Sequence, residues 1–215
     1  IMIKAFALAG YDEEILKAQK KAASVEKARH SAKTVEEERK QSIYDDHIEI
    51  FRIPTKFDDL KVLDGHAMIR MPVDFEPRSE AEIKIMFPSG NPPQELYGNS
   101  YSYFIIAFNW TNHEMSVEGI PELMPFAKQL MERMGPKARV IKSDIKQREN
   151  GNMGVMEVVA NAYQGVSYSY IFYAILEGRL LIGTVMFDRK YKDRLLPIAE
   201  EIVDSFSPVE EGASE

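Results

Sequence analysis

The residue types suited to chemistry are few in this sequence and lie far apart. Two groupings combine histidine with carboxylates, Asp45-Asp46-His47 and His113-Glu114. Imidazole and carboxylate groups are ligands that zinc and manganese accept. Adjacent residues of an extended strand point to opposite faces, so each grouping offers only part of a ligand set. We therefore interpret both as solvated strand edges and predict neither a metal nor another cofactor.

Glu157 is the one acid set among apolar neighbours, in the segment Val155-Met-Glu-Val-Val159. Such a carboxylate can act as a general base, face water, or pair across a sheet with Lys142 or Arg139, and we favour the cross-strand pair. The sequence contains no Gly-x-Ser-x-Gly turn, no His-Glu-x-x-His motif and no phosphate-binding loop. We predict a protein that is not an enzyme, with a hydrolase built on Glu157 or His113 as a remote alternative.

Tyrosines are concentrated in segments that alternate like strands. Tyr168, Tyr170 and Phe172 fall on one face of such a strand, where they can stack against a ligand or a partner, or pack within the sheet. The candidate binding surface consists of Tyr101, Tyr103, Tyr168, Tyr170 and Phe172.

Composition excludes several classes of protein. The 215 residues carry a net charge of −7, which disfavours nucleic acid and anionic lipid as partners. The absence of cysteine excludes disulfides, Cys-based metal sites and thiol catalysis. No apolar run is long enough to span a bilayer. The chain begins with Ile1, so a preceding signal, anchor or domain is left open. The expected compartment is therefore cytoplasmic, or extracytoplasmic if an upstream signal or anchor was removed.

The first part of the chain has the composition of a long helix. Residues 12–43 lack Gly and Pro and are rich in Ala, Lys and Glu. A narrow stripe of mostly small residues recurs at helical spacing, which favours packing on the body or on a partner, including a second copy. We predict a charged helical segment over 1–44, a domain over 45–207 and an acidic disordered tail over 208–215.

Residues 47 onward change to a strand-like period. Segments 47–53, 67–71, 81–87 and 101–108 alternate, and the first three each end at or before a proline. Glycines at 151, 165 and 178 then supply tight turns between predicted strands 138–148, 152–163, 166–176 and 179–187. Consecutive strands joined this way form a four-stranded antiparallel meander.

Two helices accompany these strands. One is predicted near 121–134, with Leu123, Phe126, Ala127, Leu130 and Met134 facing inward, and the other near 192–206. Pro197 suggests that the regular part of the last helix starts late. Since strands 171–176 and 180–187 are apolar on both faces, we predict an α+β fold, a three-layer α/β/α sandwich around a mostly antiparallel sheet.

The order of these elements resembles that of the Mog1/PsbP-like superfamily, especially its small bacterial members of unassigned function. The resemblance covers roughly residues 47–207 and includes the strand end Phe87-Pro-Ser-Gly-Asn-Pro-Pro-Gln-Glu-Leu-Tyr97 and the closing Ile202-Val-Asp-Ser-Phe206. It implies a non-enzymatic scaffold, since members include a binder of the GTPase Ran, an extrinsic photosystem II subunit and bacterial envelope lipoproteins. No family functional residue maps onto a particular position here, and a shared fold does not transfer function.

These observations predict a non-catalytic interaction or envelope-associated module with a protein partner, or self-association through the N-terminal helix. The alternative is a small-molecule or lipid-binding protein with an apolar pocket between sheet and helix.

Overall fold

The computed structural model describes residues 41–87, 92–100, 103–133, 138–149, 151–162 and 165–209. The chain divides into two compact units, Ile1–Gln41 and Ser42–Glu215. The helix predicted over 12–43 falls almost wholly outside the described residues. Residues 41–47 form turns and bends. Among the described helices, none is long and apolar enough to cross a membrane.

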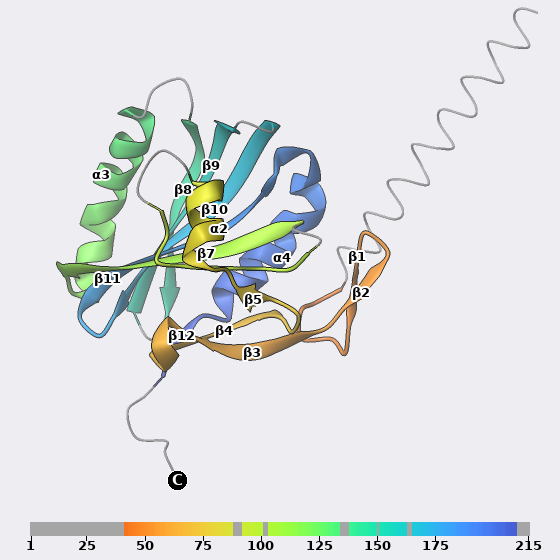
Figure 1. Cartoon of the computed structure of the whole chain (residues 1–215). Coiled ribbons are helices and arrows are strands. Elements are labelled where there is room, and N and C mark those ends of the chain that lie inside the picture. The colour runs from red at the N-terminus through yellow and green to blue at the C-terminus, as the bar shows by residue number, and fades with distance from the viewer. Residues whose placement is uncertain are drawn as a thin grey trace, which may run out of the picture. The chain divides into compact units, whose positions relative to one another are not determined.

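A seven-stranded antiparallel sheet forms the centre of the fold, in the order β5-β6-β7-β11-β10-β9-β8 (Figure 1). Its strands are β5 (Glu76–Pro77), β6 (Glu95–Gly98), β7 (Phe104–Glu114), β8 (Ala138–Arg148), β9 (Gly151–Ala162), β10 (Gly165–Leu176) and β11 (Arg179–Asp188). The predicted four-stranded meander is confirmed as β8 to β11. Gly151, Gly165 and Gly178 have positive φ at its turns, which is why glycine is needed there.

Two smaller sheets flank the large one. A hairpin pairs β1 (Ile48–Ile50) with β2 (Ile53–Thr55), and a three-stranded sheet has the order β12-β4-β3, with β3 (Phe57–Val62), β4 (Ala67–Pro72) and β12 (Ser207–Pro208). The pairing of β12 with β4, and the hydrogen bond from the Val209 amide to the His66 carbonyl oxygen, extend the fold two residues past the predicted end at 207.

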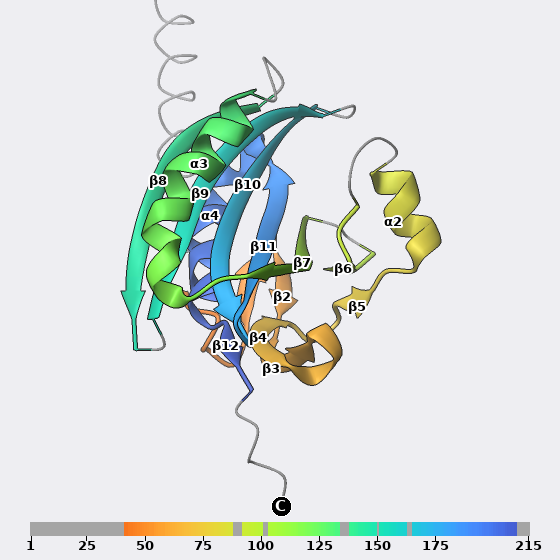
Figure 2. The same ribbon diagram turned by 90° about the vertical axis from the view of Figure 1, so that its left-hand side faces the viewer.

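Helices cover both faces of the large sheet. Figure 2 shows α3 (Ile120–Arg133) in front of β8 and β9, and α4 (Lys192–Asp204) behind the sheet. One core lies between the sheet, α4 and the three-stranded sheet, and includes Phe172, Leu195 and Ile202. The other lies under α3 and includes Ile120, Met156 and Tyr173. The α+β class and the antiparallel sheet are as predicted.

Three local predictions are wrong. Residues 81–87, expected to be a strand, form the helix α2 (Glu80–Met86), which starts with a capping box in which Ser79 and Glu82 satisfy each other's backbone amides. The expected strand 47–53 instead folds back on itself at Phe51-Arg52 as the β1–β2 hairpin. Helix α4 begins at Lys192 and contains Pro197, so its regular part does not start late.

The inward face predicted for α3 is also partly wrong. The structure buries Ala127 but leaves Phe126 60% and Leu130 52% exposed, and the buried stripe is completed by Ile120 and Met124. Met134 lies outside the described residues.

Candidate binding pocket

The β1–β2 hairpin forms one wall of a pocket and is built around an unusual turn. Both central residues, Phe51 and Arg52, have positive φ, 52° and 68°. A two-residue turn of this kind matches the twist of paired strands, but residues other than glycine adopt it at a cost of about 1–2 kcal/mol each. The Phe51 ring offsets this cost by packing against Tyr103 and Tyr191, with centroids 4.6 and 4.5 Å away. Strained backbone held by its surroundings occurs preferentially at binding sites.

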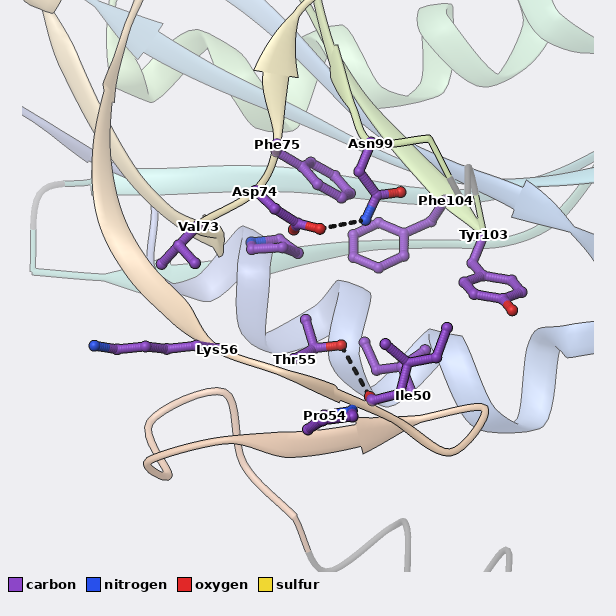
Figure 3. A pocket seen from close by; sticks show the side chains of 12 residues that line it. Ile50, Pro54, Thr55, Lys56, Val73, Asp74, Phe75, Asn99, Tyr103 and Phe104 are labelled. Atoms are coloured by element: carbon purple, nitrogen blue, oxygen red, sulfur yellow. Dashed lines mark hydrogen bonds between the residues drawn. The ribbon is translucent and has the colours of Figure 1, made fainter.

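The pocket lies between this hairpin, the connection from β4 to β5 and the start of β7, with a volume of about 240 Å³. Figure 3 shows the Phe75 and Phe104 rings along one side and Ile50 and Pro54 opposite them. The two rings pack 5.0 Å apart and both are nearly fully buried. Val73, by contrast, is 48% exposed and forms part of the rim. Most of the lining is apolar, as in ordinary small-molecule and side-chain pockets.

Polar groups in the pocket are mostly satisfied by one another. The Asn99 side-chain amide donates to the Asp74 carboxylate at 3.0 Å, and the Thr55 hydroxyl donates to the Ile53 carbonyl oxygen at 3.2 Å (Figure 3). The Lys56 ammonium group has no ion-pair partner within the part of the chain that the structure describes, and Figure 3 shows it pointing away from the aromatic wall. The pocket therefore has a mostly apolar interior, and Lys56, one of its lining residues, is without an ion-pair partner among the described residues.

The predicted aromatic surface is divided by the fold. Tyr168, Tyr170 and Phe172 are 1%, 3% and 0% exposed, so they belong to the core under α4 and present no surface. The reason is that α4 covers this face of β10, and Lys192, the first residue of α4, places its ammonium 5.3 Å from the Tyr168 ring centroid. Tyr101 lies outside the described residues, and Tyr103 lines the pocket.

Glu157 does not make the ion pair expected from the sequence. Lys142 lies opposite it in the β8–β9 register, and Arg139 lies opposite Val159. The Glu157 carboxylate, 7% exposed, instead accepts a hydrogen bond from the Tyr168 hydroxyl. Burial, and then Glu157 itself, raise the pKa of Tyr168 above its ordinary range. Burial also raises the pKa of Glu200, which faces the same pair from α4, and Glu157 adds to that rise.

The histidine groupings remain dispersed. In the described ranges no three His, Asp or Glu side chains come together in a way that could hold a metal ion. His113 is the penultimate residue of β7 and is exposed, and His47 lies in a different part of the fold, before β1. His66, which has no partner nearby in sequence, contacts Glu177 at 2.6 Å from 111 residues away. Both side chains are about two-fifths exposed, as expected of a surface contact that joins two sheets.

Sequence reasoning missed most of the pocket. Its residues come from segments far apart in the chain: Ile50 and 53–56, 72–75, and Asn99 with 103–104. Pro72 ends β4 as its type suggested, but Pro54 lies inside β2, and neither proline indicates what the strands enclose. This pocket lies among strands and loops, whereas a more open concavity lies between α3 and β8, lined by Met124, Lys128 and Asp144 among others. A ligand pocket between sheet and helix therefore stays a prediction.

Comparison with solved structures shows what this fold is similar to. Cyanobacterial PsbP (CyanoP) from Synechocystis sp. PCC 6803 superposes with a TM-score of 0.52 at 9% identity, covering 71% of this chain and 92% of its own. The predicted resemblance to the Mog1/PsbP-like superfamily is therefore confirmed at the level of fold.

Two further structures match at lower TM-scores. A Pseudomonas aeruginosa protein described as of unknown function and a putative regulator, PA94, gives a TM-score of 0.43 at 9% identity, covering 72% of this chain and 98% of its own. Mycobacterium tuberculosis LpqN, described as involved in cell envelope biogenesis, gives 0.40 at 9%, covering 72% and 91%. No family model matches the chain. No curated protein matches its sequence either.

Proposed function

We propose that this protein is a non-catalytic binding module that holds an apolar group in the pocket between the β1–β2 hairpin and the start of β7. The observation that carries the proposal is a preformed, mostly apolar concavity whose rim residue Val73 is half exposed to solvent. Leaving such surface in water is unfavourable, so covering it contributes to binding. The polar groups of the lining support the same reading, because Asp74, Asn99 and Thr55 are engaged in hydrogen bonds that shape the wall.

The size of the pocket limits its occupant. A volume of about 240 Å³ corresponds to roughly eight water-sized groups at about 30 Å³ each. One large apolar side chain of a partner protein fits this volume, whereas a whole two-chain lipid does not. An exposed side chain from a protein segment is therefore the occupant we favour.

A small amphiphile is the second candidate, favoured by Lys56. Lys56 is among the residues that line the apolar space, and its ammonium points outward from the aromatic wall (Figure 3) without an ion-pair partner among the described residues. Its flexible side chain suits the anionic head of a short chain whose apolar tail occupies the pocket. A role at the cell envelope stays a prediction, because a PsbP-like fold is compatible with many functions.

Methyl NMR of the whole chain tests the proposal. We would titrate wild type with a blocked Ala-Phe-Ala peptide and separately with hexanoate, following the methyl signals of Ile50, Ile53 and Val73. We expect saturable shifts of these signals with the peptide. Val73→Asp should abolish them, because it places a charge on the apolar rim.

A matched control is Ile85→Asp, which alters an apolar residue that is 78% exposed on α2 and does not line the pocket. This variant should bind as wild type does. If only hexanoate gives saturable shifts, and Lys56→Gln abolishes them, the ligand is a small amphiphile and not a side chain of a protein partner. Unchanged pocket methyl signals with both probes would contradict a binding role for the pocket.

A further inference from the structure

Helix α3 carries a second apolar stripe on the side that points away from the sheet. Its buried stripe contains Ile120, Met124 and Ala127, at 0%, 3% and 6% exposure. Phe126 and Leu130, one turn apart, are 60% and 52% exposed. Pairs of large apolar side chains at a spacing of four residues are neighbours on a helix surface and act as one patch.

Two opposite charges bracket this patch. Positions 122, 126, 130 and 133 are separated by four, four and three residues, so they follow one side of a helix. We name Glu122, Phe126, Leu130 and Arg133 the outer stripe of α3. Figure 2 shows the helix at the front of the molecule, with no other described element lying over it. Neither Glu122 nor Arg133 takes part in an ion pair recorded for the described residues.

The order of the four residues is self-complementary. When a second α3 lies antiparallel to the first and is related to it by a two-fold axis, Phe126 meets Leu130 of the second copy, and Leu130 meets its Phe126. The same axis places Glu122 beside Arg133 of the second copy at both ends. The two helix dipoles then oppose each other, and each charge lies near the opposite charge and near a helix end of favourable sign.

We infer that the outer stripe of α3 is the contact surface of a homodimer, with a second copy of this chain as its partner. The charge pattern favours a second copy over a different protein. An outer stripe running in the opposite direction supplies the partner for Glu122 and also the partner for Arg133. The contact is small, since α3 has 14 residues and is about 21 Å long. It therefore falls below the area of a standard stable interface, and the dimer dissociates on dilution.

Sedimentation velocity of the full chain over a wide range of concentration tests the inference. We expect a monomer–dimer equilibrium in wild type, and Phe126→Glu should raise its dissociation constant at least about tenfold by burying a carboxylate against Leu130 of the partner. Ile85→Glu is the control, because it makes the same kind of change at an exposed residue outside the stripe. Circular dichroism of each variant establishes that the fold is retained.

A charge exchange identifies the second copy. Glu122→Arg and Arg133→Glu should each weaken the dimer, since like charges then face one another across the axis. The double variant should restore it, because both pairs are again opposite in sign. A wild type that stays monomeric at every concentration would overturn the inference. So would a dimer that is indifferent to Phe126→Glu, since association would then lie elsewhere in the chain, or a double variant no better than the single ones.

Discussion

The hydrogen bond between Tyr168 and Glu157 gives the most direct test of how the core is stabilised. Tyr168→Phe removes only the hydroxyl group, from a side chain that is 1% exposed, and leaves a carboxylate that is 7% exposed without its donor. A hydrogen bond to a charged group contributes about 1.5–3 kcal/mol, and an unsatisfied buried acceptor retains its desolvation cost. We therefore expect Tyr168→Phe to lower the free energy of unfolding by about 2 kcal/mol.

The measurement is urea denaturation at neutral pH, followed by thermal denaturation. A loss of this size corresponds to a melting temperature about 4–8 °C lower for a domain of this size. Tyr173→Phe is the matched control. Tyr173 is also a tyrosine of β10 and 3% exposed, but its hydroxyl makes no hydrogen bond recorded for the described residues. It should change stability much less.

A double-mutant cycle separates the pair from its parts. Glu157→Leu alone leaves the Tyr168 hydroxyl unpaired, whereas Glu157→Leu with Tyr168→Phe removes both polar groups. The double variant should therefore be more stable than the sum of the single losses implies. Losses below about 0.5 kcal/mol for Tyr168→Phe, or strictly additive effects, would refute the reasoning.

Two further predictions concern the same sheet. Gly183→Ala should lower the free energy of unfolding by about 1–3 kcal/mol in urea denaturation. A Cβ at this position would overlap the ring of Phe172, which is fully buried and cannot move aside. An unchanged denaturation midpoint would contradict this. Stability should also fall as pH rises above 10.0, because burial raises the pKa of Tyr168 and Tyr170 above that value and raises the pKa of Tyr173 to about 12. The unfolded chain loses these protons first, so the folded state then binds more protons and the slope of stability with pH is negative. Denaturation midpoints from pH 8 upward check the sign, and Tyr168→Phe should reduce the slope.

The meander could be predicted from sequence because its determinants are local. A glycine at each turn and an apolar alternation on both sides specify hairpins without reference to the rest of the chain. Helix α2 was missed because the apolar residues of its short segment fit a strand-like period of two as well as they fit helical spacing. Ser79 and Glu82, three residues apart, are the signal that distinguishes the two, since they form the capping box.

The candidate pocket could not be predicted in the same way. The turn at Phe51 and Arg52 contains no glycine, so its positive φ values depend on contacts of the Phe51 ring with Tyr103 and Tyr191. These residues are distant in sequence, and no local sequence pattern indicates that they are in contact. The burial of Tyr168 depends likewise on α4, more than twenty residues further on. Both the β1–β2 turn and the burial of Tyr168 are therefore determined by tertiary contacts, and not by the hydrophobic period of the local sequence.

The outer edge of the large sheet limits how copies of this protein can associate. Strand β8 ends the sheet and has a bulge between Val140 and Lys142. It also carries cations at 139, 142, 146 and 148. An irregular, positively charged edge resists the addition of another strand, which is how natural sheets avoid open-ended growth into aggregates. Association through the sheet edge is thereby disfavoured, and a helical contact with closed two-fold symmetry can form without leading to fibres.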